Sequence, residues 1–256
     1  MILVTGASGA LGSAIVRKLG ERGVETAAGT RNPSDGARRV DFDRPATLTP
    51  AFAGVDTLVF VSAGYAEDDV VMERHRNVVE AAVSAGVGHV VYTSLVGAGE
   101  RLGIALAHRY TERIVRESGI PFTILRNGLY TELFDAFAEA NVADGVLSLP
   151  LGRGRVAAIP REDLADVAAD VALDPSAHVG EVVELAGTEA VGGEELAAGL
   201  GEKLGRAIAY EPVPLASFRQ RLLDVGVPGF EAAHAISIMA NVQAGLLGET
   251  GRKGAR

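Results

Sequence analysis

The chain has 256 residues, of which 48% are hydrophobic and 22% are charged, a composition typical of a folded globular protein and not of a disordered one. Its formal net charge of -9 disfavours a nucleic acid partner, because binding to phosphates requires a basic surface. The absence of cysteine excludes disulfides and thiolate chemistry, and the scattered histidines lack ligand spacing, so no metal site is expected.

Short β-branched segments alternate with helical patterns along the first half of the chain. Leu11, Ile15 and Leu19, for example, share one stripe of a helix. Segments that are apolar on both faces are typical of parallel strands covered by helices. The expected strands are residues 2–5, 25–29, 57–61, 89–93, 122–126 and 181–185. This order predicts an α/β fold with a doubly wound parallel sheet of the Rossmann type.

The second half of the chain is less regular. Helical patterns cover residues 132–141 and 162–173, and three more follow residue 191. We expect a dinucleotide-binding domain and a smaller, mainly helical substrate-binding part. The domain would comprise residues 1–130, with 155–188 returning to it, and the smaller part residues 131–154 and 189–256. The ending GETGRKGAR is polar and rich in glycine, so we expect a frayed tail.

The segment VTGASGALG follows the first strand and opens the first helix. Among its glycines, one permits the tight turn, one lets the backbone approach a pyrophosphate, and one allows close packing of helix on sheet. The helix N-terminus adds N–H groups and a positive dipole end for the phosphates. The sequence therefore predicts a dinucleotide site, with contacts from Gly6, Ser8, Gly9, Ala10, Leu11 and Gly12.

The tip of the second strand, TRNPSD, distinguishes NADP from NAD. An acidic residue there would bond the ribose hydroxyls of NAD, whereas an arginine accommodates the 2′-phosphate of NADP. Arg31 occupies this tip, and the first acidic residue after it is Asp35. Since guanidinium matches phosphate bidentately, we expect NADPH with Arg31 on its 2′-phosphate; a solvated loop charge is the alternative.

Further contacts follow from the rule that ligands bind at the carboxyl ends of parallel strands. The expected cofactor contacts there are Asp41 and Phe42 near the adenine, Val61, Ser62 and Ala63 near a ribose, Thr93 and Ser94, and Asn127 with Gly128. The apolar candidates for the wall of a substrate pocket are Leu95, Leu129, Tyr130, Phe134 and Phe137. Phe134 and Phe137 fit helix packing equally well.

Several longer segments carry a family resemblance. They are TRNP, HRNVVEAAVSAGVGHVVYTSL, the TE at positions 111 and 112, SGIPFTILRNGLYTE, IPREDLADVAADVAL and GEVVELAGTEAVGGEELAAGLGEKLGR. Over roughly residues 1 to 215 the chain resembles the NmrA-like atypical short-chain dehydrogenase/reductases. Within them it is most similar to the bacterial NAD(P)H:quinone oxidoreductase group, to which triphenylmethane-dye reductases also look related. The resemblance implies an NADPH-dependent reductase.

The resemblance also raises a question about catalysis. In catalytic members of the wider superfamily a tyrosine precedes a lysine by four residues, and a glutamate often follows four further on. Aligning Glu112 with that glutamate places His108 at the lysine position and Ile104 at the tyrosine position. An apolar side chain exchanges no proton, so alcohol dehydrogenation is disfavoured. The catalytic candidates are therefore Ser94 and His108, the latter either bonding the nicotinamide ribose or protonating the product; a surface histidine is the alternative.

A quinone would avoid the need for a strong acid. Hydride adds to an electrophilic ring, and conjugation stabilises the oxyanion that forms. The protein then contributes mainly by holding the acceptor close to the nicotinamide in the right orientation. We therefore expect an NADPH-dependent reductase of a quinone or a similar aromatic acceptor. A redox-sensing regulator that binds NADP without turnover, and a tailoring ketoreductase acting on a polycyclic substrate, remain alternatives.

The sequence gives no sign of a membrane partner. No apolar segment reaches the roughly 18 residues of a membrane span. The strand-like start at Ile2 leaves no room for a signal sequence, so we expect a cytoplasmic protein without a membrane partner. Its ligands would be small molecules, and the chain would act as a monomer or a homodimer.

Overall fold

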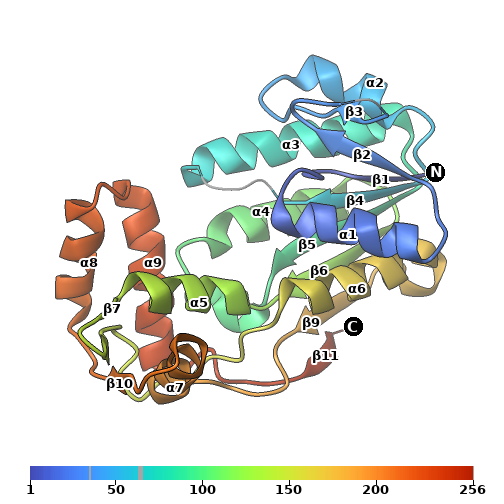
Figure 1. The fold of residues 1–256 in the computed structure, drawn as a ribbon. Helices are drawn as coiled ribbons and strands as arrows, with labels where there is room; N and C mark the ends of the chain where they lie inside the picture. The colour runs from blue at the N-terminus through green and yellow to red at the C-terminus, as the bar shows by residue number, and fades with distance from the viewer. Residues whose placement is uncertain (35, 63–65, 256) are drawn as a thin grey trace.

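The computed structural model describes residues 1–34, 36–62 and 66–255. Its main sheet runs in the order β11–β9–β6–β5–β4–β1–β2–β3 (Figure 1). The strands are β1 (Ile2–Val4), β2 (Thr26–Thr30), β3 (Arg38–Arg39), β4 (Thr57–Val61), β5 (His89–Leu95), β6 (Phe122–Asn127), β9 (Val182–Leu185) and β11 (Arg252–Ala255). All neighbours pair in parallel except β11 and β9. The predicted doubly wound Rossmann sheet is confirmed, and its strand order reverses at β1 and β4, where such folds bind ligands.

Helices cover both faces of the sheet. Those on one face are α1 (Ala10–Glu21) and α6 (Arg161–Leu173), and those on the other are α2 (Leu48–Phe52), α3 (Asp68–Ala85) and α4 (Ala105–Glu117). Every residue of β5 is buried because helices lie on both sides of it. Its side chains alternate between two apolar clusters, with Tyr92 facing α3 and α4 and Val91 facing α1 and α6. None of the described helices is both long and apolar enough to cross a bilayer.

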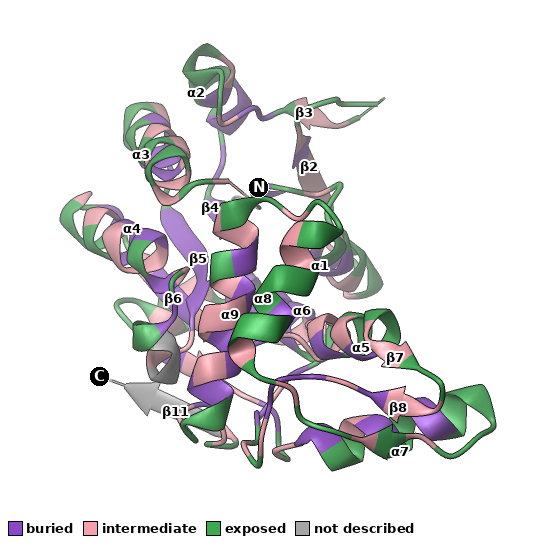
Figure 2. Cartoon of the chain, turned by 90° about the vertical axis from the view of Figure 1, so that its left-hand side faces the viewer, coloured by how far each residue is buried: buried purple, intermediate pink, exposed green. Residues whose placement is uncertain are grey.

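A third apolar cluster lies beyond the carboxyl ends of the strands (Figure 1). The elements around it are α5 (Thr131–Ala140), α7 (Gly193–Leu204), α8 (Leu215–Asp224), α9 (Gly229–Gln243), β7 (Val142–Ala143), β8 (Val146–Leu147) and β10 (Ala209–Tyr210). Figure 2 shows α8 largely exposed on the outside, with α9 more deeply buried behind it. Leu95, Leu102 and Ala105 belong to this cluster too, so the core continues into the Rossmann part. The division into two domains stays a prediction.

The prediction of a frayed tail is wrong for residues 252–255. They form β11, which pairs antiparallel with β9 in the register Arg252↔Leu185 to Ala255↔Val182. Gly251 extends this contact, because its N–H donates to Gly187 O at 3.0 Å and its O accepts from Ala186 N at 3.2 Å. Without β11, one side of β9 would present open N–H and C=O groups as an edge strand. Backbone pairing of this kind needs no apolar side chains, so composition gave no sign of it.

Candidate functional site

The glycine loop has a geometry that only glycine satisfies. Gly6 adopts a φ of 61°, in the left-handed region, directly after β1. A Cβ on Gly12 would lie 2.2 Å from Gly6 O, so α1 could not pack this close to the loop with any other residue there. Gly9 is the N-cap of α1, and its N–H donates to Gly6 O at 2.8 Å. The three glycines therefore bring the helix N-terminus against the end of β1.

The N-terminus of α1 is open to an anion. The first helical hydrogen bond runs from Ser13 N–H to Gly9 O at 2.9 Å, so the N–H groups just before Ser13 have no helical partner. Its first turn carries no acidic residue. The exposed Ser8 accepts a hydrogen bond from Thr30 Oγ1 at 3.2 Å, which ties the loop to the tip of β2. Leu11 is buried, so its side chain packs inside and only its backbone is available to a ligand. The dipole and the free N–H groups fit a pyrophosphate.

Positive charge gathers at the tip of β2. Arg31 is exposed there, directly after Thr30. Arg74 of α3, which sequence reasoning missed, donates to Asp43 through Nε at 2.7 Å and Nη2 at 2.9 Å. The pKa of Asp43 is lowered, mainly by these hydrogen bonds and to a smaller extent by the charge of Arg31. Two guanidinium groups thus lie near one carboxylate at the place where a 2′-phosphate is expected.

The residues expected near the adenine are part of the local structure. The carboxylate of Asp41 accepts from Asp43 N at 3.2 Å and lies 3.7 Å from Arg44 Nε, so it organises the turn after β3. Phe42 packs edge-on against Phe60, with 5.8 Å between ring centroids, and remains partly exposed. A role for Asp41 and Phe42 in framing adenine stays a prediction.

The ends of the central strands are joined by side-chain hydrogen bonds. Thr5 Oγ1 accepts from Val61 N at 3.0 Å and donates to Val61 O at 3.2 Å. Ser62 N donates to Thr93 Oγ1 at 3.1 Å. Ala63, the third residue expected near the ribose, lies outside the described residues. These contacts place β1, β4 and β5 on one rim, as predicted from their order.

Asn127 and Gly128 continue the rim at the end of β6. Asn127 is buried, and its Oδ1 has no hydrogen-bond partner among the described residues. A buried carbonyl oxygen without a partner is costly, so a ligand N–H is the kind of group that would satisfy it. A Cβ on Gly128 would lie 2.8 Å from Leu185 O, so the backbone of β6 and the segment after β9 are in close contact.

Ser94, a predicted catalytic residue, has its proton engaged elsewhere. It is buried, and its hydroxyl donates to Glu112 Oε1 at 2.6 Å. Arg126 also bonds this carboxylate, through Nε at 2.9 Å and Nη2 at 2.7 Å. Burial acts to raise the pKa of Glu112, but the hydrogen bonds from Arg126 and Ser94 outweigh it, so the pKa is lowered. Because Ser94 serves an ionised carboxylate inside the protein, this geometry argues against direct proton transfer by Ser94.

The same ionic network holds the turn after β5. Arg109 donates to Glu112 at 2.7 Å and, through Nη1 and Nη2, to the carbonyl of Leu95 at 3.1 Å. Glu184 of β9 accepts from Gly97 N at 2.6 Å and from Arg126 Nη1 at 3.0 Å. Residues 95–97, where the turn enters the short helix η2 (Gly97–Arg101), are therefore fixed by charged side chains on both sides.

His108 lies on α4, with its ring turned toward β5. Its Nδ1 is 3.0 Å from the hydroxyl of Tyr92, a fully buried residue that sequence reasoning did not single out. Burial lowers the pKa of His108 to about 4, so the ring is neutral at pH 7. A neutral ring offers no charged acid at this pH, which disfavours the expected protonation of the product by His108; its place in the site stays a prediction. His75 is buried as well, with its Nδ1 at 2.6 Å from Thr111 Oγ1.

The apolar candidates differ in their access to a ligand. Phe134 is fully buried in the third cluster, and Phe137 packs between it and Phe218 with centroid distances of 6.3 and 6.2 Å. Their interpretation as helix-packing residues therefore fits better than a place in the pocket wall, most clearly for Phe134. Tyr130 is partly exposed under the guanidinium of Arg161, whose Cζ lies 4.6 Å from the ring centroid.

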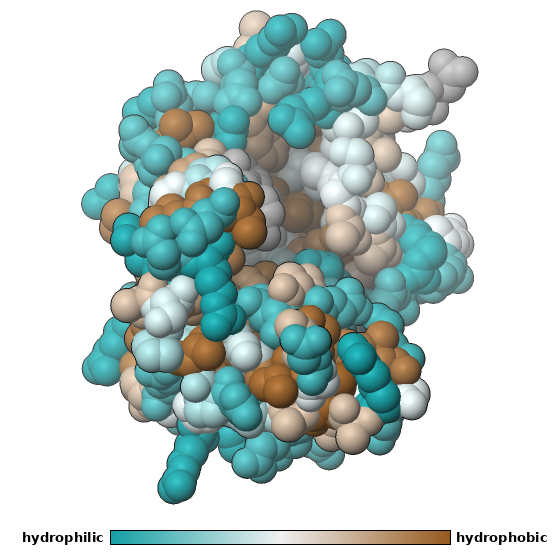
Figure 3. All heavy atoms as spheres, turned by 60° about the vertical axis from the view of Figure 1, so that its left-hand side comes forward, coloured by the Kyte–Doolittle hydropathy of each residue, from teal (hydrophilic) through white to brown (hydrophobic). Residues whose placement is uncertain are grey.

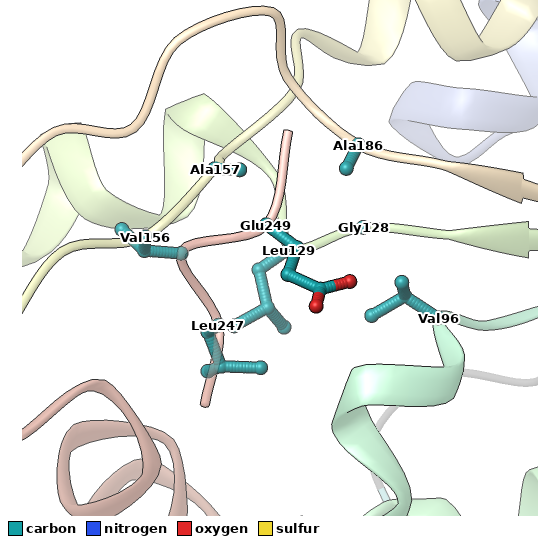
Figure 4. A pocket seen from close by; sticks show the side chains of 8 residues that line it. All are labelled: Val96, Gly128, Leu129, Val156, Ala157, Ala186, Leu247 and Glu249. Carbon is teal, nitrogen blue, oxygen red and sulfur yellow. The ribbon is translucent and has the colours of Figure 1, made fainter. Parts of the chain in front are cut away.

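The surface is hollowed where these segments meet. Figure 3 shows a depression with apolar residues on its floor, between the two parts of the molecule. A small pocket lies at the ends of β6 and β9 (Figure 4), lined by Val96, Gly128, Leu129, Val156, Ala157, Ala186, Leu247 and Glu249. Two residues predicted from the sequence, Gly128 and Leu129, line this pocket together with Leu247 and Glu249 of the C-terminal segment. No local sequence pattern could predict that these two segments meet.

Known proteins share this arrangement. The model of the NmrA-like family matches residues 1–246. Quinone oxidoreductase 2 of Escherichia coli strain K12 is 37% identical over 240 residues, which are 89% of this chain and 83% of that protein. A crystal structure of an NADPH-dependent quinone oxidoreductase from Escherichia coli, in complex with NADPH, superposes with a TM-score of 0.88 at 35% identity and covers 97% of this chain and 91% of that one.

A crystal structure of the Citrobacter sp. triphenylmethane reductase complexed with NADP(H) superposes equally well. Its TM-score is 0.88 at 31% identity, and the match covers 98% of this chain and 92% of that one. The family match extends through the glycine loop, the network around Glu112 and the C-terminal helices. The chain therefore belongs to the NmrA-like family.

Proposed function

We propose that this protein is an NADPH-dependent reductase that transfers hydride to a quinone or a similar electrophilic aromatic acceptor, without a Tyr-Lys catalytic pair. The observation that carries the proposal is the glycine cradle, in which a Cβ on Gly12 would strike Gly6 O at 2.2 Å. Such close packing positions a helix N-terminus for a dinucleotide pyrophosphate. The relatives named above are a quinone reductase and a dye reductase, which supports the same acceptor class.

Residues of the chain fit three parts of NADPH. The α1 N-terminus would bind the pyrophosphate, and Arg31, with Arg74 near it, would bind the 2′-phosphate. The unpaired Oδ1 of Asn127 would accept from an amide N–H such as that of the carboxamide. When bound, NADPH supplies the hydride. The chain supplies orientation, and the apolar floor of the depression shown in Figure 3 excludes water from the acceptor.

Two residues at four-residue spacing, Ile104 at the N-cap of α4 and His108 within it, support an acceptor that needs no strong acid. Ile104, at the position aligned with the superfamily tyrosine, packs against the third apolar cluster. His108 is neutral at pH 7 because burial lowers its pKa to about 4, so it offers a hydrogen bond in place of a charged acid. A quinone accepts hydride and holds the resulting charge on a conjugated oxygen, and a cationic dye needs no proton at all.

The test is consumption of NADPH by the purified protein with a panel of quinones, cationic dyes and simple ketones. We expect turnover with quinones or dyes and none with simple ketones. Binding of NADPH without turnover of any acceptor would favour the redox-sensing regulator, and turnover of ketones alone would favour the ketoreductase. Calorimetry that detects binding of neither NADPH nor NADH would refute all three.

A further inference from the structure

Tyr92 and His108 form a closely held pair between β5 and α4. The phenol oxygen of Tyr92 lies 3.0 Å from His108 Nδ1, and the two ring centroids are 6.2 Å apart. Tyr92 is fully buried, so it touches neither solvent nor a ligand in the depression. His108 is less buried, and its Nδ1 is occupied by the phenol, which leaves Nε2 as the ring nitrogen available to a ligand.

The protonation states of the pair follow from burial. Burial raises the pKa of Tyr92, so the phenol keeps its single proton throughout the neutral range. Burial lowers the pKa of His108 to about 4, so the imidazole carries one proton on one of its two nitrogens. A neutral imidazole has one donor and one acceptor nitrogen, and the partner of one nitrogen determines which is which.

The surroundings of Tyr92 favour donation from the phenol to His108. The neighbouring hydroxyl of Thr111 donates to Ala107 O at 2.7 Å and lies 2.6 Å from His75 Nδ1. Because the Thr111 proton goes to Ala107, His75 is the donor to Thr111, and Thr111 has no proton to offer Tyr92. The phenol therefore has two possible acceptors, the Thr111 oxygen, which already accepts from His75, and Nδ1 of His108. An imidazole nitrogen is a stronger base than a hydroxyl oxygen, so donation to Nδ1 is favoured.

Aromatic packing holds the phenol in place. The ring of Tyr92 lies 5.0 Å from that of Phe60 and 6.0 Å from that of His75, measured between centroids. These contacts surround the ring within the apolar cluster under α3 and α4. The packing fixes the Tyr92 ring and therefore the position of the hydroxyl that bonds His108.

We infer that Tyr92 is a positioning residue: its phenol donates to Nδ1 of His108, keeps the histidine proton on Nε2, and presents Nε2–H to the carbonyl oxygen of the acceptor. This inference rests on the proposed function. Hydride brings two electrons and one proton to the quinone and leaves the hydroquinone monoanion, whose oxygen accepts the Nε2–H hydrogen bond. A proton from water completes the hydroquinone, so His108 ends the cycle as it began. The tyrosine thus acts on the reaction through the histidine.

The first test is the tautomer of His108, read from the ¹⁵N shifts of the imidazole in the labelled full-length protein without cofactor. Resonances are assigned with His108→Ala. We expect a single Nε2–H form with a hydrogen-bonded Nδ1, and in Tyr92→Phe a shifted Nδ1 resonance and a mixture of tautomers. A wild-type ring that carries its proton on Nδ1, or a spectrum unchanged by Tyr92→Phe, would overturn the inference.

The second test is kinetic, with the best quinone of the panel. Tyr92→Phe should lower kcat about threefold to tenfold, as expected for one lost hydrogen bond, and leave the Kd for NADPH unchanged. In a His108→Ala background the same change should have no further effect on kcat. Tyr210→Phe is the matched control, because its phenol also makes partly buried hydrogen bonds, to Leu149 O and Leu151 N, but lies on β10, away from α4 (Figure 1).

The outcomes separate this inference from the proposed function. Absence of turnover in the wild-type protein would refute the proposed function. Normal turnover that Tyr92→Phe leaves unchanged, or an equal effect of Tyr92→Phe with and without His108, would refute the positioning role alone.

Discussion

Two buried histidines should make the protein lose stability in mild acid. His75 and His89 are 1% and 5% exposed, and burial lowers the pKa of His75 to about 3 and that of His89 to about 4. An unfolded histidine titrates near a pKa of about 6.5. Between these values the unfolded chain binds protons that the native state does not, so the free energy of unfolding falls as the pH falls below about 6.5.

The size of the effect follows from the same pKa values. At pH 5.0 an unfolded histidine is almost fully protonated, whereas both native rings remain mostly neutral. Relative to pH 7.5, linkage gives a loss of about 2 kcal/mol for each histidine, or about 4 kcal/mol for the pair. His108, whose pKa burial lowers to about 4, adds a loss in the same direction. A domain has a total stability of about 5–15 kcal/mol, so the loss is large. Ion-paired carboxylates lower the free energy of unfolding only at a more acidic pH, since their pKa values in the unfolded chain are about 4.

The assay is urea unfolding followed by circular dichroism at pH 7.5, 6.0 and 5.0. His89→Gln keeps a hydrogen-bonding group toward Thr123 but cannot gain a proton. Between pH 7.5 and 5.0 its free energy of unfolding should therefore fall by about 2 kcal/mol less than that of the wild type. Tyr210→Phe removes a partly buried hydroxyl and no group that titrates in this range, so it should keep the wild-type pH dependence. A wild-type stability equal at pH 7.5 and 5.0 would refute the reasoning.

Three substitutions test the site directly. Gly12→Ala places a Cβ 2.2 Å from Gly6 O, so it should weaken NADPH binding about tenfold or more, as measured by calorimetry. Gly20→Ala in the same helix is the control: its Cβ meets no atom within 4 Å, and it should raise the free energy of unfolding by up to about 1 kcal/mol. Arg31→Asp should weaken NADPH binding far more than NADH binding in the same titrations; equal losses would remove Arg31 from the site. Glu112→Gln removes the carboxylate that Arg126 and Arg109 share, although Arg126 keeps Glu184, and should cost about 3 kcal/mol in urea unfolding. The exposed Glu117→Gln in the same helix is the control.

Local patterns were sufficient to predict six of the eight strands of the main sheet, all but β3 and β11, because these strands and the glycine turn are encoded in a few consecutive residues. The expected strand at residues 89–93 begins where β5 begins, and β5 continues two residues further, to Leu95. Gly6 and Gly12 have the backbone geometry that the motif requires. The order of the strands then placed Val61, Thr93 and Asn127 at one edge by a general rule of parallel sheets.

Pairings between distant residues could not be predicted in the same way. Arg74 and Asp43 are 31 positions apart, and Tyr92 meets His108 across the gap between a strand and a helix. The sequence VVYTS does contain a signal, since a polar hydroxyl on a strand buried on both faces must find a partner. Alternation along β5 gives the direction of the Tyr92 side chain, but the register of α4 against the sheet is set by tertiary packing.

Ile104, His108 and Glu112 follow one another at four-residue spacing from the N-cap of α4, and their contacts are consistent with the proposed reductase that works without a Tyr-Lys pair. Ile104 is packed in the third apolar cluster, His108 is bonded to Tyr92, and Glu112 neutralises Arg126. All three side chains thus make structural contacts that hold this side of the site rigid, and none of them is a charged proton donor. A wall of this kind stabilises a developing oxyanion by a fixed neutral dipole, which acts without reorganisation but releases no proton. In the proposed reductase such a wall would favour acceptors whose reduced form is stable as an anion. We therefore expect discrimination between a quinone and a simple ketone through the chemistry of the acceptor more than through the shape of the pocket.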